Sequence, residues 1–554
     1  MTDFEKMMEL AFQNMKTQHA ELSDQPIFEI TEAEEIMLPM TDGVKLRTII
    51  RKPTDEGPFP TIIVRTCYPH GERIQNLKAE EYCKRGFAFV YQYCRGSGGS
   101  GGKWEPNVNE RADGKVTLDW LDAQEWVENI GYFGSSYLAL TGWAIADIIP
   151  NKLKTLYLTH YGTDRFTSAY KNGLFRQDIL TSWAMDNAGS PITADYLESV
   201  SYRPQINVDE KLWGMHLNWY RDWITNTQRS DPYWQVGFWK LLSEIPSKVK
   251  VPVYIGEGWY DHHLGSALKT WESLSSESKK HSVLRLGAWN HGFMPCVDGI
   301  TANNIENSDV KSSYEWFDGI LRKKTLPKAG VSIYRIVADS WEHVSSYPFK
   351  RNKQEEYYLS DYGLENALSV LEGSRSYSYN PDNPVTIHGA ESLFKSITGV
   401  GSRIQPECNY RDDVLSFVSA PLDNKLDILG KIIVELYVST DAEDTAFTAR
   451  LMEVREDGTY NVRGSIATLA FRDGETRGSY TPGEIVKLTI DMWDIAWRFQ
   501  KGSKLRLDIS SSAFPEYAVH TNKAGVWSVQ EDAVITKQTL HFGGKYPSKI
   551  VLPL

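Results

Sequence analysis

GYFGSSYLALTGW, residues 131–143, is a short apolar run that ends in the tetrapeptide GSSY and continues directly into a helical pattern. A serine hydroxyl is a weak nucleophile, and a hydrolase activates it by holding it on a tight turn between a strand and a helix. Gly134, two residues before Ser136, is small enough to permit that turn. The full pattern G-x-S-x-G is absent because Leu138 occupies the position of the second glycine. The stretch therefore predicts a nucleophile elbow, and the alternative is an ordinary loop before a core helix.

Strand-like and helix-like patterns alternate on both sides of this stretch. Runs rich in β-branched and aromatic residues predict strands at 61–65, 87–93, 154–158, 251–261 and within 281–292. Apolar residues at helical spacing predict helices at 72–85, 113–128 and 266–276. A run that is apolar almost throughout, such as FAFVYQY at 87–93, is typical of a parallel strand covered on both faces. The alternation predicts a parallel, doubly wound α/β sheet.

Two further strands of this sheet lead to residues that could serve a serine nucleophile. VPVYIGEGWYD ends in Asp261, and HSVLRLGAWNHG leads to a loop that carries His291. Ligands of open α/β sheets bind at the carboxyl ends of the strands, and the order Ser, Asp, His is that of α/β-hydrolases. We therefore predict Ser136 as nucleophile, His291 as base and Asp261 as the acid that orients the imidazole. Taken singly, Asp261 could instead cap the next helix, and His291 could be a loop histidine.

A glycine-rich segment suggests a cofactor site that its context does not support. Residues 96–101, GSGGSG, match the dinucleotide pattern G-x-G-x-x-G directly after a predicted strand. The following residues, KWEPNVNERADG, do not begin a helix, so no helix N-terminus is offered to a pyrophosphate. We predict no nucleotide and no other cofactor.

Composition limits the classes of partner and compartment. The 554-residue chain carries 60 Lys and Arg against 72 Asp and Glu, a net charge of -12, without blocks of like charge, which argues against a nucleic-acid partner. It has no secretory signal pattern at its start and no apolar run long enough to span a membrane. Five scattered cysteines without C-x-x-C spacing predict reduced thiols and no metal site: Cys67, Cys83, Cys94, Cys296 and Cys408. We expect a cytoplasmic protein without membrane contact.

The pattern of elements also divides the chain. Residues 1–158 are expected to hold a leader helix and the first part of the α/β core, and residues 248–327 its second part. Residues 159–247, rich in Trp, Tyr and Asn with helical patches, are expected to form an inserted helical cap. From residue 328 to 554, alternating strands and turns predict a separate all-β sandwich or jelly roll.

Six blocks of sequence carry a resemblance to a known family. They are RTCYPH at 65–70, CRGSGGSGG at 94–102, GSSYLALTGW at 134–143, GWYD at 258–261, GAWNHG at 287–292 and FPEYAVHTN at 514–522. In these blocks the chain resembles the family of cocaine esterase, α-amino-acid ester hydrolases and X-Pro dipeptidyl-peptidase-like hydrolases. The resemblance implies an α/β-hydrolase core, a helical cap and a C-terminal jelly-roll (galactose-binding-like) domain that helps wall the active site. It also implies an oxyanion hole formed by the Tyr137 backbone amide and the Tyr68 hydroxyl, although Tyr68 could instead be a loop aromatic with its hydroxyl in solvent.

The chain departs from the family pattern at several positions. Ala139 stands where the family usually has Gly, and Tyr93 stands where an Asp commonly precedes the Arg-Gly pair. The amino-acid ester hydrolases carry carboxylates, part of them just after the catalytic acid, that hold the substrate ammonium, whereas this chain has His262 and His263 there. We therefore expect esters of neutral carboxylic acids to be better substrates than compounds with a free α-ammonium, unless other cap carboxylates such as Asp186 or Asp195 substitute.

The expected function is that of a serine hydrolase that cleaves small-molecule carboxylic esters or amides through an acyl-enzyme. X-Pro dipeptidyl-peptidase, α-amino-acid ester hydrolase and acyltransferase activities remain alternatives, and a carbohydrate-binding non-enzyme is a distant one. A homo-oligomer is left open. An apolar acyl pocket is expected from cap tryptophans that could equally be core anchors: Trp183, Trp213, Trp219, Trp223, Trp234 and Trp239.

Overall fold

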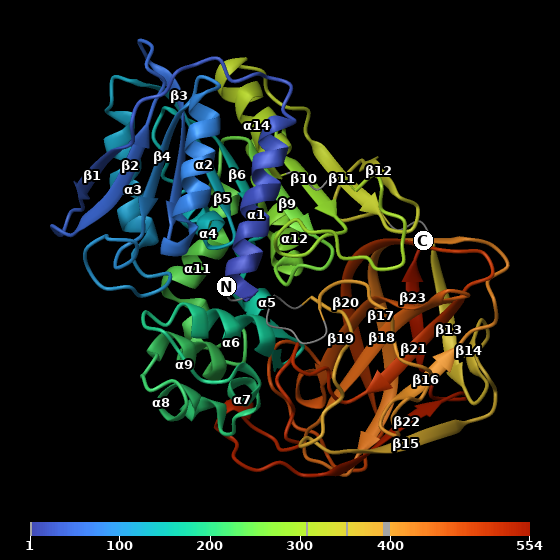
Figure 1. The fold of residues 1–554 in the computed structure, drawn as a ribbon. Helices are drawn as coiled ribbons and strands as arrows, with labels where there is room; N and C mark the ends of the chain where they lie inside the picture. The colour runs from blue at the N-terminus through green and yellow to red at the C-terminus, as the bar shows by residue number, and fades with distance from the viewer. Residues whose placement is uncertain (1–2, 306–308, 351–352, 392–398) are drawn as a thin grey trace.

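A ten-stranded mixed sheet forms the framework of the N-terminal part of the molecule (Figure 1). The computed structural model describes residues 3–305, 309–350, 353–391 and 399–554. The strand order is β1-β2-β4-β3-β5-β6-β9-β10-β11-β12, parallel from β4 to β11 and antiparallel at both edges. The strands are β1 Glu34–Pro39, β2 Lys45–Arg51, β3 Phe59–Thr66, β4 Ala88–Tyr93, β5 Val127–Ser135, β6 Leu153–Thr159, β9 Val253–Gly258, β10 Val283–Gly287, β11 Gly330–Arg335 and β12 Ser340–Val344. The expected α/β-hydrolase core is confirmed, and the sheet that the alternation predicted as parallel is parallel over its central strands and antiparallel at its edges.

Helices cover both faces of this sheet because successive residues of its strands point to opposite sides. Ile63 and Tyr132 face one core, whereas their neighbours Ile62 and Phe133 face the other. The first face is covered by α3 (Glu110–Asp122), α4 (Tyr137–Trp143) and α12 (Leu264–Ser273). The second face is covered by α2 (Glu72–Cys83) and α14 (Asp309–Phe317), over which α1 (Asp3–Ala20) packs. Burial on both faces explains why these strands are apolar almost throughout.

A helical cap lies between β6 and β9, as expected. In Figure 1 it sits beneath the α/β core and beside the C-terminal β domain. Its helices are short: α5 Arg165–Ala169, α6 Gln177–Asp186, α7 Tyr196–Ser201, α8 Val208–Lys211, α9 Asn218–Thr225, α10 Pro232–Gln235 and α11 Gly237–Glu244. The cap also contains a small hairpin, formed by β7 (Tyr170–Lys171) and β8 (Leu174–Phe175). Its turn is hydrogen-bonded to the C-terminal domain, because Asn172 Nδ2 donates to Ile466 O at 2.9 Å.

The C-terminal domain is a β-sandwich in the described residues. One sheet has the order β14-β13-β23-β17-β22-β15, with β20 on β17, and the other has the order β16-β21-β18-β19. Every second residue of the long strand β17 is buried, as expected for one face on a core. The strands are β13 Gln354–Ser360, β14 Gly363–Glu365, β15 Gly373–Tyr379, β16 Leu415–Val418, β17 Leu426–Thr440, β18 Ala446–Arg455, β19 Gly458–Thr468, β20 Val486–Phe499, β21 Lys504–Ser510, β22 Thr536–Phe542 and β23 Lys549–Pro553.

Sheet membership differs from the sequence division at one point. The strands β11 and β12 follow residue 328, where the sequence division begins the β domain, but they extend the α/β sheet through β10. An antiparallel hairpin has the same alternating pattern in either sheet, and only its pairing partner distinguishes the two. Judged by its hydrogen-bonded strands, the α/β sheet ends at Val344, the last residue of β12.

Arg463 of β19 joins the two domains close to the end of β9. Its side chain is buried, and it donates to the carbonyl oxygens of Trp259 and, at 2.8 Å, of Asp494. It also forms an ion pair with Glu391 at 2.7 Å. Trp259 lies two residues before Asp261, so the sandwich supports the turn that carries the predicted catalytic acid.

We predict that Arg463→Leu destabilises the protein by about 3 kcal/mol or more, because it leaves the buried carbonyl oxygens of Trp259 and Asp494 without this donor and removes one of the two arginines paired with Glu391, the other being Arg176. The matched control is Arg498→Leu on β20, which breaks a partly exposed ion pair with Asp427 of β17 and should cost at most about 1 kcal/mol. Thermal unfolding of the two variants measures the difference. Equal unfolding temperatures would show that Arg463 does not hold the domains together.

Candidate active site

Ser136 lies on a strained turn between β5 and α4. Its backbone has φ 58° and ψ -129°, in the region that residues with a side chain rarely adopt. A Cβ on Gly134 would lie 2.2 Å from the carbonyl oxygen of Leu138, so glycine is required there. Leu138, in the second glycine position of the usual pattern, packs into the core beneath the sheet. The elbow therefore depends on Gly134 and not on a second glycine.

The three residues predicted as a triad lie together at the carboxyl ends of β5, β9 and β10. His291 Nε2 is 2.7 Å from Ser136 Oγ, and His291 Nδ1 is 2.7 Å from Asp261 Oδ2. Ser136 and His291 line the same pocket, whereas Asp261 is fully buried behind the imidazole. This arrangement lets His291 accept a proton from Ser136 while Asp261 holds the other ring nitrogen.

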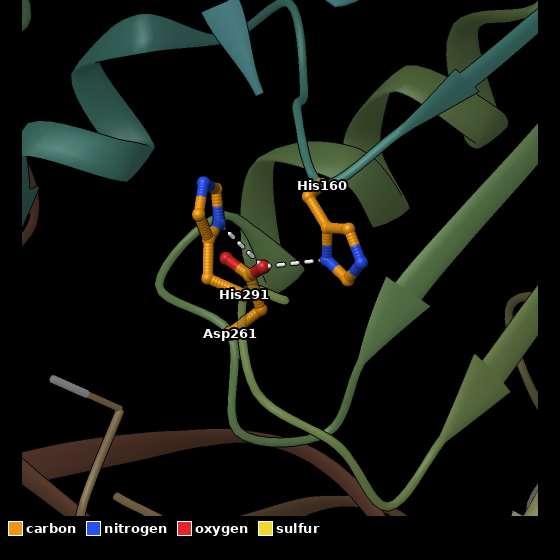
Figure 2. A group of neighbouring side chains, drawn as sticks. All are labelled: His160, Asp261 and His291. Atoms are coloured by element: carbon orange, nitrogen blue, oxygen red, sulfur yellow. Dashed lines mark hydrogen bonds and ion pairs between the residues drawn. The ribbon is translucent and has the colours of Figure 1, made fainter. Parts of the chain in front are cut away.

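A second imidazole, His160, contacts the same carboxylate. Figure 2 shows Asp261 between the rings of His160 and His291, and His160 Nδ1 is 2.8 Å from Asp261 Oδ2. His160 is fully buried, directly follows β6 and has a positive φ of 54°. His160 is not among the residues predicted from the sequence, although the strand-end rule that selected Asp261 applies to it equally.

The same three side chains have the residue types of a metal site. Their ligand atoms lie within 4.8 Å of one another. With an N–H on each Nδ1, both imidazoles donate to Asp261, so hydrogen bonding accounts for the observed spacing.

The charge of Asp261 is stabilised despite its burial. Burial alone raises the pKa of Asp261, but the adjacent His291 imidazole and hydrogen bonds from His160 and His291 bring it well below its usual value. The backbone N–H of His263 adds a 2.7 Å hydrogen bond to Asp261 Oδ1. Nearby, burial and the charge of Asp261 raise the pKa of Glu257 well above its usual value. Asp261 is therefore the anion of the pair, and Glu257 is the neutral acid.

The hydroxyl of Tyr68, the side chain predicted as an oxyanion donor, lies beside Ser136 and Trp183. It hydrogen-bonds with Ser136, and it accepts a 3.1 Å hydrogen bond from Trp183 Nε1. Burial, followed by the nearby Cys67, raises the pKa of Tyr68 well above its usual value, so the phenol keeps its proton. Trp183 uses an acceptor position of the hydroxyl and leaves its proton free to donate.

Tyr137 begins α4, and its hydroxyl is bonded behind the site. It is the first residue of α4, so its amide N–H has no acceptor within the helix. Its hydroxyl accepts from the Asn107 amide at 2.8 Å and donates to Glu110 at 2.5 Å. These bonds anchor the start of α4 behind Ser136.

The pocket in front of Ser136 is lined by the α/β core and the cap. All of its described lining residues lie between positions 107 and 291, so the sandwich supports the site from behind without forming its wall. Of the six cap tryptophans, Trp183 and Trp223 line the pocket, and the others are outside this lining. The residues are Asn107, Ser136, Tyr137, Tyr161, Arg165, Ile179, Leu180, Trp183, Trp223, His262, His263 and His291.

The residues after Asp261 bring no negative charge to this pocket. His262 and His263 are buried, and burial lowers the pKa of each well below its usual value, so both are neutral. Asp195 caps α7 at the cap surface, and neither Asp195 nor Asp186 belongs to the described pocket lining.

Three other features of the chain bear on the sequence analysis. The turn at 96–102 is not followed by a helix until α3 begins at Glu110. Its Gly98, with φ 53°, packs so closely on Tyr93 that a Cβ would lie 2.0 Å from the ring. All five cysteines are free thiols. In the described residues no helix has the length and apolarity to cross a membrane.

Comparison with known proteins places this chain in a family. The model of X-Pro dipeptidyl-peptidase (S15 family) matches residues 42–293, and that of the X-Pro dipeptidyl-peptidase C-terminal non-catalytic domain matches residues 323–551. Cocaine esterase of Rhodococcus sp. (strain MB1 Bresler) is 27% identical over 94% of this chain and 98% of its own.

Solved structures show the same fold. An α-amino acid ester hydrolase superposes with a TM-score of 0.80 at 22% identity, covering 96% of this chain and 99% of its own. An aminopeptidase from a marine sediment Thaumarchaeota archaeon superposes with a TM-score of 0.79 at 18% identity, covering 96% and 97%. With both family models matched in order along one chain, the protein belongs to the X-Pro dipeptidyl-peptidase-like family of serine hydrolases, which act on ester or peptide bonds.

Proposed function

We propose that the protein cleaves carboxylic esters through an acyl-enzyme on Ser136, with His291 as general base and Asp261 as its orienting acid. The observation that carries this proposal is the continuous chain of 2.7 Å contacts from Ser136 Oγ through His291 to Asp261, which begins at a strained strand-to-helix turn. A serine with no base in reach would not be nucleophilic at neutral pH.

In the first half-reaction, Ser136 Oγ attacks the ester carbonyl carbon as its proton passes to His291 Nε2. The carbonyl oxygen becomes an oxyanion, which accepts from the Tyr68 hydroxyl and the Tyr137 amide. Asp261 stabilises the imidazolium without taking its proton. The oxyanion then re-forms the carbonyl, the carbon–oxygen bond to the alcohol breaks, and His291 protonates the departing alcohol.

In the second half-reaction, water takes the place of the alcohol. His291 Nε2 removes a proton from this water, and the resulting hydroxide attacks the acyl carbon. Collapse of the second oxyanion releases the carboxylic acid and returns the proton to Ser136 Oγ. An amide substrate would follow the same steps with an amine as leaving group.

Substrates with a free α-ammonium fit this pocket less well. A buried ammonium needs a carboxylate partner, and the described pocket lining contains neither Asp nor Glu. X-Pro dipeptidyl-peptidase and α-amino-acid ester hydrolase activities are therefore secondary candidates, kept because of the family. The carbohydrate-binding alternative is set aside because the family is one of enzymes.

A fluorophosphonate probe should label Ser136, because the proposed nucleophile is the most reactive hydroxyl in the site. Peptide mapping should locate the label, and the label should be lost in Ser136→Ala. The neighbouring Ser135→Ala variant is the matched control and should still be labelled.

Asp261→Asn and His291→Ala should fold and lose turnover by roughly 10⁴-fold. Persistent labelling of Ser136→Ala, or a near-normal rate in Asp261→Asn, would exclude this triad.

Tyr68→Phe should lower kcat by about 10² to 10³, with KM little changed, because it removes one oxyanion donor and leaves substrate binding intact. Tyr137→Phe is the contrasting variant. It keeps the backbone donor but leaves Glu110 and the Asn107 amide without a partner, so its main effect should be on stability, about 1 to 3 kcal/mol. Steady-state kinetics and thermal unfolding separate the two effects. A raised KM at constant kcat in Tyr68→Phe would make Tyr68 a substrate-binding residue.

We include His160 as a positioning residue of this mechanism, since it gives Asp261 a second N–H donor. His160→Gly removes the donor while tolerating the positive φ, and it should lower kcat about 10-fold or more with KM little changed. His160→Asn also tolerates this backbone and retains an N–H, so it should recover part of kcat. If both folded variants turned over at the wild-type rate, His160 would have only a packing role.

A further inference from the structure

Arg165 brings a buried positive charge into the pocket in front of Ser136. It is the first residue of α5, and its side chain is only 8% exposed. It lines the same pocket as Ser136 and His291. Because an arginine stays protonated at every working pH, it is the one permanently charged side chain in the described lining.

The guanidinium of Arg165 is held by aromatic residues. Its central carbon lies 4.7 Å from the ring centre of Trp223 and 5.7 Å from that of Trp239. It donates a hydrogen bond to the Tyr161 hydroxyl, and its Nε has no partner in the described part of the chain. Aromatic faces hold a cation in place, but they do not satisfy its N–H groups.

No described carboxylate pairs with this guanidinium. Asp164, the adjacent residue, bonds to Arg229 at 2.9 Å and to Lys269 at 3.1 Å instead. Although burial opposes it, these two cations lower the pKa of Asp164 to about 2. Asp222, the one acid of the neighbouring helix α9, has a pKa raised by burial, the opposite of what an ion pair with Arg165 would produce.

A buried, unpaired guanidinium is costly unless something else supplies its counter-charge. The remaining polar groups of this part of the pocket are neutral, as shown for His262 and His263. A carboxylate would complete the site, because its two oxygens match the planar fork of a guanidinium.

We propose that Arg165 binds a carboxylate of the substrate, so that the preferred substrates are esters with a second, ionised carboxyl group, such as half-esters of dicarboxylic acids. The proposal rests on the esterase function and specifies its substrate class. It extends the expected order of substrates: kcat/KM should be higher for anionic esters than for neutral esters, and higher for neutral esters than for esters with an ammonium group. Arg165 then acts as a specificity residue that is dispensable for hydrolysis itself.

The test compares kcat/KM for three p-nitrophenyl esters of similar acyl length. They are the half-ester of adipic acid, its neutral monoamide analogue and the ester of the corresponding amino acid with a terminal ammonium. The wild-type enzyme should prefer the half-ester to the amide by about 10- to 100-fold, mainly through KM, as one charged hydrogen-bonded contact provides. A second pair, p-carboxyphenyl and p-carbamoylphenyl butyrate, carries the carboxylate or amide on the leaving alcohol. It therefore determines whether Arg165 binds a carboxylate on the acyl group or on the alcohol group of the ester.

Arg165→Met should abolish this preference, so that the acid and the amide of each pair are hydrolysed with similar kcat/KM. Lys269→Met is the matched control: it removes a half-exposed cation near Asp164 and should leave the preference intact. Should Arg165→Met fail to fold, Arg165→Lys decides, because a charge without the planar fork should keep a reduced preference. Equal rates for acid and amide in both pairs, or a preference that survives in Arg165→Met, would overturn the proposal.

Binding to an inactive variant separates this proposal from the esterase function. By calorimetry, Ser136→Ala should bind adipic acid monoamide more tightly than the neutral diamide, and the double variant with Arg165→Met should not discriminate. If no ester were hydrolysed but this discrimination remained, the esterase function would fail while the carboxylate site stood. If esters were hydrolysed without discrimination, the carboxylate site would fail alone.

Discussion

The buried charge of Asp261 is the constraint on which the rest of the site depends. A carboxylate without solvent needs donors on both oxygens, and here they come from three places in the chain. His291 and His160 reach one oxygen from the ends of β10 and β6, and the His263 amide reaches the other from the start of α12. These contacts require the strand ends to stay in register, so the sheet orients the imidazole that faces Ser136.

The sandwich domain contributes to the same constraint from outside the pocket. Arg463 bonds the carbonyl of Trp259, on the turn between β9 and Asp261, and is itself neutralised by Glu391. A cap and a second domain packed around this turn exclude water from it. Exclusion of water strengthens the hydrogen bonds to Asp261 and makes the loss of any one of them costly. The domain whose family model is that of a non-catalytic domain thus supports the turn that carries Asp261 in this chain.

The net charge of the pocket in front of Ser136 depends on which of the nearby charged residues form ion pairs outside it. Asp164 forms ion pairs with Arg229 and Lys269. The two histidines after Asp261 are neutral because burial lowers their pKa values. Arg165 is left with aromatic neighbours and one phenol, facing the pocket in front of Ser136. An ammonium there would meet a cation without a compensating carboxylate, whereas an anion would meet a prepared donor.

The amino-acid sequence by itself determined the strand and helix alternation and the elbow around Ser136, and it set Asp261 and His291 in α/β-hydrolase order. These features are local: burial on both faces makes a strand continuously apolar, and a tight turn requires Gly134 whatever surrounds it. Only the tertiary structure decided which sheet the hairpin β11–β12 joins, that His160 shares the carboxylate with His291, and that Arg165 stays unpaired while Asp164 does not. Each of these features depends on contacts between residues far apart in the chain. The packing of the strands and of the cap determines which of these contacts form, and the local periodicity of the sequence does not.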